Sequence, residues 1–325
     1  KVIRQRRFHH PPHIEAELQR QCDQLLKAGI LEHSDSPYDS PAFLVKKQNG
    51  SLRKVVDFRA INKITEASYF PMQSIEDCIS LVGEEAPAYF SLCDQRSGFW
   101  SLKLHPDSRK YTAFSTARHH LQYTRLSMGL TNSPVSYMAA LSKLLHSELA
   151  SRAVLYADDL LLFTNSFEGH LQLLETVFAK FDSANLRMNA EKCKFFVNSL
   201  VFIGFRMSKE GISVDSSRFD VIKNYPKPTN AKQVRSFLGL VLFFKRFIKS
   251  HCTITAPLRK LLQLNEPFNW NEEHDRSFQT LKDAILSETV LIYPRLNEEF
   301  TVHLDASKHG LGFALSQKVN GIDKF

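Results

Sequence analysis

The sequence contains no run of about eighteen apolar residues, so it predicts no membrane-spanning helix and we expect no membrane partner. Its 5 cysteines are scattered, and none forms a pair at the spacing of a metal-binding or redox motif. We therefore expect free thiols in a reducing compartment. The chain also lacks low-complexity tracts and internal repeats, which excludes repeat proteins and compositionally biased ones.

Acidic residues are fewer than basic ones in this sequence. The chain has 42 Lys plus Arg against 34 Asp plus Glu, a net charge of +8. A moderate excess of this kind suggests a polyanionic partner without proving one. The length of 325 residues predicts two or three compact units, and the first and last residues suggest a piece of a longer chain.

The most informative stretch is 154–163, which reads VLYADDLLLF. Two short apolar runs around acidic residues are typical of a buried hairpin, with Asp158 and Asp159 at its tip. Neighbouring carboxylates in a partly dry setting repel each other and need a cation. Their hard oxygen ligands suit Mg²⁺. Taken alone, the same pattern also fits a solvated Asp-Asp turn.

A third carboxylate, Asp94, ends a predicted strand over 89–94. If that strand neighbours the Asp-Asp hairpin in one sheet, the three carboxylates could hold two divalent ions about 4 Å apart, as two-metal phosphoryl transfer requires. A predicted basic hairpin, 42–46 with 52–58, offers Lys47 and Arg53 to a triphosphate. A solvated basic hairpin is the alternative for that feature.

Periodicity and capping signals predict the remaining elements. The expected helices span 11–31, 75–82, 133–149, 167–184, 217–224, 231–247, 256–264 and 272–287. The expected hairpins pair 111–114 with 121–125, 195–197 with 201–205, and 300–305 with 311–315.

Seven motifs occur in one order along the chain. They are LRKVVDFRAINK (52–63), FSLCDQRSGF (90–99), LSMGLTNSP (126–134), YADD (156–159), NAEKCKF (189–195), FIGF (202–205) and VRSFLGL (234–240). Together they resemble a retroelement reverse transcriptase, most similar to the gypsy class of long-terminal-repeat retrotransposons. The resemblance extends over about residues 14–317.

The resemblance implies an α+β right-hand polymerase: fingers, a palm with an antiparallel sheet, a helical thumb, a connection and a truncated RNase H start. The expected parts are an N-terminal segment and fingers (1–88), a palm (89–210) with a fingers insertion around 106–127, a thumb (211–265), a connection (266–298) and the start of RNase H (299–325).

The resemblance also implies roles for individual residues. Asp94, Asp158 and Asp159 would be the catalytic carboxylates and metal ligands, with the carbonyl of Gln95 as a further ligand. The expected cofactor is two Mg²⁺ ions, with Mn²⁺ as a substitute. The residues expected at the incoming dNTP are Lys47, Arg53, Phe99 and Met128. Among these, Phe99 would block a ribose 2′-hydroxyl, so deoxynucleotides are the expected substrate.

Further roles follow from the same resemblance. Tyr156, Ile203, Gly204 and Phe205 would position the primer 3′ end. Asp305 would be the first carboxylate of an RNase H site whose other ligands would lie past Phe325, so we expect no RNase H activity from this chain. The thumb cations expected to contact phosphates are Lys223, Lys227, Lys232, Arg235, Lys245 and Arg246.

Several positions depart from the common pattern of this class. Ser127 and Met128 replace a proline and an aromatic, Cys93 and Gln95 replace aliphatic residues, and Ala157 is smaller than usual. These departures bear on rate and fidelity and leave the three carboxylates intact.

The expected function is RNA- and DNA-directed DNA synthesis on an RNA/DNA or DNA/DNA template-primer. An RNA-dependent RNA polymerase is one alternative, against which Phe99 argues. A non-catalytic nucleic-acid-binding relic is the other, disfavoured by the intact carboxylates. Other Pol or Gag segments are expected partners, and the expected location is a cytoplasmic virus-like particle and the nucleus. The oligomeric state is not indicated.

Overall fold

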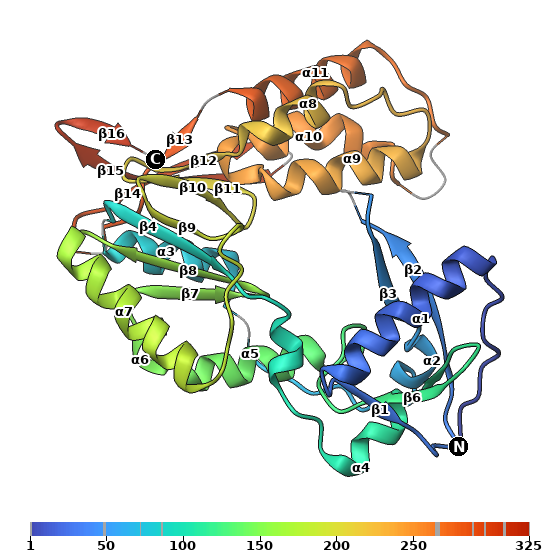
Figure 1. The fold of residues 1–325 in the computed structure, drawn as a ribbon. Helices are drawn as coiled ribbons and strands as arrows, with labels where there is room; N and C mark the ends of the chain where they lie inside the picture. Colours follow the sequence, from blue (N-terminus) through green and yellow to red (C-terminus); the bar gives the residue numbers. More distant parts are fainter. Residues whose placement is uncertain are drawn as a thin grey trace. The chain divides into compact units, whose positions relative to one another are not determined.

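The computed structural model describes residues 2–47, 50–71, 73–85, 87–263, 267–287, 289–295, 297–307 and 310–324, without the side chains of 305–307, 310 and 311. The chain forms two compact units (Figure 1). Unit 1 comprises residues 1–72, 92–160 and 172–193, and unit 2 comprises residues 73–91, 161–171 and 194–325. Each unit is therefore assembled from separate stretches of the chain.

A five-stranded sheet in the order β1-β6-β5-β2-β3 organises the N-terminal part of unit 1. Its strands are β1 (Leu31–His33), β2 (Ser40–Lys46), β3 (Leu52–Val56), β5 (Phe114–Ser115) and β6 (His120–Tyr123). Helix α1 (Pro12–Lys27) begins with proline in its first turn and buries Leu18 and Cys22 in the same core as the sheet. The predicted β2–β3 and β5–β6 hairpins are confirmed.

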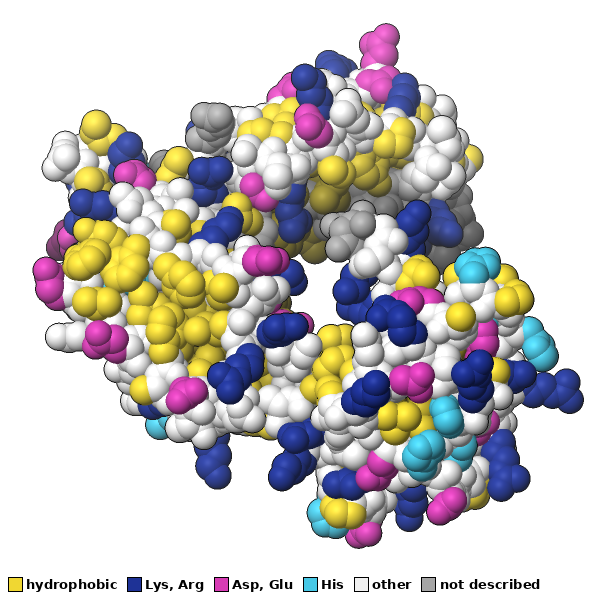
Figure 2. Space-filling model, viewed as in Figure 1, with side chains coloured by type: hydrophobic (Ala, Val, Ile, Leu, Met, Phe, Trp, Pro, Cys, Tyr) yellow, Lys and Arg dark blue, Asp and Glu magenta, His cyan; other side chains and the backbone are white. Residues whose placement is uncertain are grey.

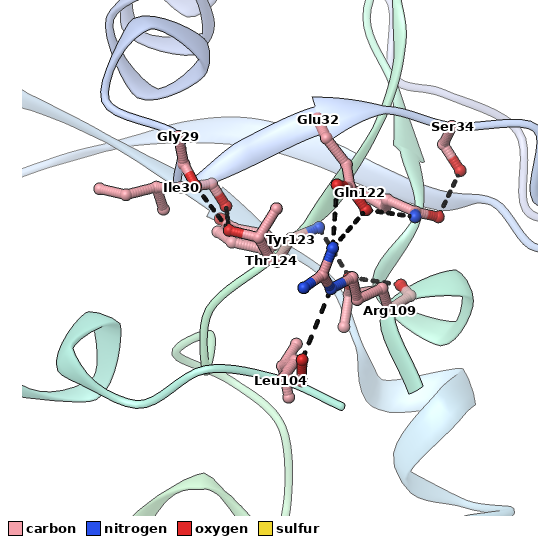
Figure 3. Close-up of polar contacts among 10 residues, drawn as sticks. Gly29, Ile30, Glu32, Ser34, Leu104, Arg109, Gln122, Tyr123 and Thr124 are labelled. Carbon is pink, nitrogen blue, oxygen red and sulfur yellow. Dashed lines mark hydrogen bonds and ion pairs between the residues drawn. The ribbon is translucent and has the colours of Figure 1, made fainter. Parts of the chain in front are cut away.

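A polar cluster ties β1 to β6 and to the segment before β5 (Figure 3). The carboxylate of Glu32 accepts hydrogen bonds from Arg109, at 3.1 and 3.4 Å, and from Gln122, at 2.8 Å. The amide oxygen of Gln122 accepts in turn from Ser34, at 2.7 Å. Because these groups are half-buried, each depends on the others for its polar contacts.

The rest of unit 1 is mainly helical. Its elements are α2 (Arg59–Asn62), η1 (Gly98–Ser101), α4 (Pro106–Arg109), η2 (Lys110–Thr112), α5 (Ser133–Leu144) and α6 (His146–Leu149). The single helix predicted over 133–149 is thus two helices, separated at Leu145.

A four-stranded sheet in the order β7-β8-β4-β9 carries the acidic motifs. Its strands are β4 (Tyr89–Asp94), β7 (Ala153–Tyr156), β8 (Asp159–Thr164) and β9 (Lys194–Val197). The predicted pairing of 195–197 with 201–205 is wrong, because β9 joins this sheet and 201–205 contributes to another. Helix α7 (Phe167–Ser183) buries Leu174 and Phe181, whereas Leu171 and Phe178, which have the same helical spacing, are exposed.

Unit 2 contains a second four-stranded sheet, in the order β10-β11-β12-β13, and a group of helices (Figure 1). The strands are β10 (Ser199–Phe202), β11 (Phe205–Ser208), β12 (Gly211–Val214) and β13 (Val290–Leu291). The helices are α3 (Ile75–Glu84), η3 (Ser216–Arg218), α8 (Phe219–Lys223), α9 (Ala231–Phe243), η4 (Lys245–Phe247), α10 (His251–Lys260) and α11 (Glu272–Leu286). The helix predicted over 256–264 begins and ends earlier than expected, at His251 and Lys260, and Pro257 lies inside it.

The C-terminal strands are β14 (Thr301–Ser307), β15 (Gly310–Val319) and β16 (Ile322–Lys324). The predicted pairing of the first two is confirmed, with Leu304 opposite Phe313. In the described part of the chain, no helix is both long and apolar enough to cross a membrane.

Candidate active site

The Asp-Asp motif occupies the tip of the β7–β8 hairpin. The strands are buried, with Leu155 4% exposed and Leu160 fully buried, because their apolar side chains pack in the interior. The turn places Ala157 in a left-handed conformation, with φ of 53°. Alanine keeps the Cβ atom that makes this conformation unfavourable, but it avoids the further crowding of a β-branched side chain. Asp158 and Asp159 therefore reach solvent at the end of a rigid support.

Asp94 ends β4, the strand next to β8 in the sheet order. The segment 189–193 holds its backbone: the carbonyl of Asp94 accepts a hydrogen bond from the Asn189 amide at 2.9 Å, and its amide donates to the Cys193 sulfur at 3.3 Å. The Lys192 ammonium lies 3.5 Å from the Asp94 carboxylate. The neighbouring strands thus bring Asp94 into the electrostatic reach of the hairpin carboxylates.

The three carboxylates influence one another. Partial removal of water raises the pKa of Asp158, and the charge of Asp94 raises it further. The pKa of Asp159 is raised by loss of water and then by the charges of Asp94 and Asp158, while Lys192 lowers it. Like charges gathered in this way favour a bound cation.

The donor set fits a hard divalent cation, since it consists of carboxylate oxygens. Among the described residues, no three His, Cys, Asp or Glu side chains already converge as a closed metal site. Asp94 instead has Lys192 beside it. The residues that could hold a metal are therefore Asp94, Asp158 and Asp159, whose backbones are fixed and whose side chains remain accessible to solvent.

Tyr137 of α5 contacts Gln95 and Phe99, two residues that follow Asp94 closely in the sequence. Its hydroxyl donates a hydrogen bond to the side-chain oxygen of Gln95, and its ring lies 5.2 Å from that of Phe99 at 67°. The hydroxyl also occupies the space that a Cβ on Gly98 would need, so only glycine fits there. Burial, then the charges of Asp158 and Asp94, raise the pKa of Tyr137. The ring of Phe99, the residue predicted to exclude a ribose 2′-hydroxyl, therefore packs against the buried ring of Tyr137.

The loop that contains Met128 is held by Asn62. The Asn62 side chain donates to the Gly129 carbonyl at 2.8 Å and accepts from the Thr131 amide at 2.9 Å. Gly129 has φ of 91°, which favours glycine. Met128 is 45% exposed, so its side chain is presented by an anchored loop.

Lys47 and Arg53 lie near the turn end of the β2–β3 hairpin and are both exposed. Neither forms an ion pair with any residue that the structure describes, so both can bind an external anion. Lys54, on the same hairpin, is engaged within the protein: its ammonium donates to the Tyr123 hydroxyl at 2.6 Å and lies 4.3 Å from the Phe114 ring centroid. It stabilises the hairpin from within.

The turn predicted to position the primer lies in unit 2, between β10 and β11. Ile203 and Gly204 both have positive φ, and a Cβ on Gly204 would lie 2.9 Å from the Arg218 guanidinium. Phe205 is 1% exposed and stacks on Phe243 at 4.8 Å, so its side chain supports the turn and is not free to contact a primer. Tyr156, in unit 1, is half-buried at the end of β7.

The six expected thumb cations differ in their surroundings. Lys227 pairs with Asp275 at 2.7 Å, and Arg246 pairs with Glu76 at 2.7 Å, so both are already partly neutralised. Lysine and arginine side chains are spread over both units on the face shown in Figure 2. Asp305 lies in β14 and its backbone is opposite Gly312 of β15, while its side chain is not among the described ones.

Sequence reasoning missed Tyr137, Lys192 and Cys193 as parts of this site. Lys192 and Cys193 stood inside a recognised motif, which was a usable signal. Tyr137 gave no signal, because an aromatic residue on a helix is usually a core residue and its hydroxyl contact comes from chain distant in sequence.

The profile of a family described as "Reverse transcriptase (RNA-dependent DNA polymerase)" matches residues 45–207, and one described as "RNase H-like domain found in reverse transcriptase" matches residues 270–323. The retrovirus-related Pol polyprotein from transposon 412 of Drosophila melanogaster is 36% identical over 317 residues, 95% of this chain and 26% of that protein. The corresponding polyprotein from transposon gypsy of the same organism is 33% identical over 313 residues, 91% of this chain and 30% of that protein. The chain thus spans about a quarter to a third of these relatives.

Two solved structures are similar in fold. A foamy viral protease-reverse transcriptase in complex with double-stranded DNA matches with a TM-score of 0.88 and 27% identity, over 100% of this chain and 57% of that one. The same kind of protein in complex with an RNA/DNA hybrid matches with a TM-score of 0.77 and 26% identity, over 98% and 45% of the two chains.

Proposed function

Because this chain belongs to the reverse transcriptase family, we propose that it extends a primer 3′ end with deoxynucleotides, copying either RNA or DNA. The observation that carries the proposal is the position of Asp94 at the end of β4, beside the hairpin of Asp158 and Asp159, where its charge adds to the effect of burial in raising the pKa of both hairpin carboxylates. The template-primer duplex as partner is supported by the similar structures, which hold double-stranded DNA or an RNA/DNA hybrid.

In this proposal the carboxylates hold divalent metal, with Mg²⁺ as the chosen ion. When bound, the metal lowers the pKa of the attacking hydroxyl and stabilises negative charge on the phosphate. The strands below Asp94 and the hairpin hold the backbones of the three aspartates, so only their side chains have to move to converge on the metal. Lys192, beside Asp94, must give up that contact or share it as the site fills.

Other residues select and orient the nucleotide. The exposed cations Lys47 and Arg53 would contact the triphosphate. Phe99, held by the Tyr137 ring, would exclude a ribose 2′-hydroxyl by steric contact. Met128 would lie against the nucleotide from its anchored loop. Ile203 and Gly204 would contact the primer with Phe205 as their support.

Primer extension tests this proposal. The reaction contains a poly(rA) template, an oligo(dT) primer, dTTP and Mg²⁺, with wild type beside Asp158→Asn. We expect wild-type extension that the substitution abolishes, because it removes a charged ligand. Asp107→Asn is the matched control, since Asp107 is an exposed carboxylate of α4 and should behave as wild type.

Two outcomes would replace the proposal. Extension with ribonucleotides in preference to deoxynucleotides would favour an RNA-dependent RNA polymerase. Duplex binding by folded wild type without any metal-dependent extension would favour a non-catalytic nucleic-acid-binding protein. Survival of full activity in Asp158→Asn would show that the reaction occurs elsewhere.

A further inference from the structure

Unit 1 contains a cavity of about 430 Å³ that the proposed reaction does not use. Helix α5 contributes Tyr137, Ala140 and Leu144 to its lining, and the remaining wall includes Leu102, which follows η1, and Leu186, which follows α7. The volume is that of a small-molecule pocket, and most lining side chains are apolar. The cavity therefore suits a compact apolar molecule.

Lys143 contributes the only charge to this lining. Its side chain is exposed, and it forms no ion pair within the described ranges of the chain. An apolar cavity with one lysine complements a molecule that has an apolar body and a single anionic group, because the body displaces water while the ammonium pairs with the anion.

Tyr137 links the cavity to the catalytic neighbourhood. Tyr137 lines the cavity, its ring packs on Phe99, and its hydroxyl donates a hydrogen bond to the side chain of Gln95, the residue after Asp94. Tyr137 is only 2% exposed, so an occupant that pushes on its ring must also disturb these contacts.

We propose that this cavity binds a small apolar molecule carrying one carboxylate or sulfonate, and that its occupation lowers polymerase activity by shifting Tyr137 against Phe99 and Gln95. The effect on activity rests on the proposed polymerase function, whereas the binding site itself does not.

The first test measures binding by the fluorescence of anilinonaphthalene sulfonate, an aromatic anion. Ala140→Trp fills the cavity and should weaken binding at least about tenfold, the effect of losing roughly 1.4 kcal/mol of apolar contact. Lys143→Glu should weaken probe binding by about two- to fivefold, as expected for the loss of an exposed charge pair. Lys27→Glu is the matched control, because Lys27 is exposed at the end of α1 and does not line the cavity.

The binding data alone can overturn the site. Wild-type affinity in folded Ala140→Trp would place the probe elsewhere, and if that variant does not fold, equal affinity in Lys143→Glu and Lys27→Glu would do the same. Decanoate should displace the probe more effectively than decanol. Equal displacement by the two compounds would refute the requirement for an anionic group on the ligand.

The second test measures primer extension by wild type and Lys143→Glu at increasing decanoate. We expect kcat to fall in wild type, with a change in the dNTP over rNTP preference, and a weaker effect in Lys143→Glu. Probe binding with no change in kcat or preference would refute the coupling through Tyr137. A wild type without any extension would refute the polymerase function and leave the binding result standing.

Discussion

We predict the change in the free energy of unfolding that follows when the hydrogen bond between Tyr137 and Gln95 is removed. Tyr137→Phe removes the hydroxyl and leaves the Gln95 side-chain oxygen without that donor. The Gln95 side-chain nitrogen is buried and already has no partner among the described residues. A buried polar group left unpaired costs about 1–3 kcal/mol, so Tyr137→Phe should lower the free energy of unfolding of unit 1 by that amount.

A double substitution separates the bond from simple loss of packing. Gln95→Leu alone leaves the buried Tyr137 hydroxyl unpaired and should cost a similar amount. Tyr137→Phe with Gln95→Leu leaves neither group and places two apolar side chains in contact. The double variant should therefore lose less stability than the two single changes added together, by about 1 kcal/mol or more.

Tryptophan fluorescence during urea unfolding can measure this cycle in the correct unit. The chain has 2 tryptophans, Trp100 in unit 1 and Trp270 in unit 2. In a Trp270→Phe background the remaining signal comes from Trp100, which is only five residues from Gln95 in the sequence. Additive effects, within about 0.5 kcal/mol, would refute the reasoning that the two groups satisfy each other.

Three further predictions concern the site and the thumb. Because the pKa values of Asp158 and Asp159 are raised in the folded protein, ionisation of these carboxyls opposes folding. The metal-free protein should therefore lose stability as the pH rises from the ordinary pKa of 3.8 through the raised values. Asp158→Asn should raise the urea midpoint at neutral pH, and an unchanged midpoint would contradict the raised pKa. Phe99→Ala should lower the dNTP over rNTP preference in kcat/KM by roughly ten- to a hundredfold, and an unchanged ratio would remove the gate role. Lys223→Ala should reduce the slope of log affinity against log salt concentration for duplex binding by about 0.9. Lys227→Ala should reduce this slope less, because Asp275 already pairs with Lys227. Equal slopes for the two variants would contradict the predicted difference.

Local patterns were enough to predict most helices and the principal hairpins. In 154–163, short apolar runs around two acidic residues specify a buried hairpin with an exposed tip, because both signals lie within ten residues. The order of motifs was likewise sufficient to indicate the family, which the match over residues 45–207 confirms. These features depend on neighbours along the chain.

Other features depended on contacts between distant segments. The pairing of β9 was predicted wrongly because an apolar strand can pair with any exposed strand edge, and only the sheet order shows that it joins β4 and not β10. Leu171 and Phe178 fitted the apolar period of α7 yet are exposed, since periodicity does not reveal how much of a helix face becomes buried.

The sequence by itself therefore determined the acidic hairpin, the candidate carboxylates and the family, since each is encoded by residue types close together or in a set order. Only the tertiary structure placed Asp94 on the strand beside β8, Cys193 on its backbone and Tyr137 between Gln95 and Phe99. The physical reason is that hydrogen bonds, ring contacts and electrostatic coupling fall off within a few ångströms, while the residues concerned are tens of positions apart in the chain.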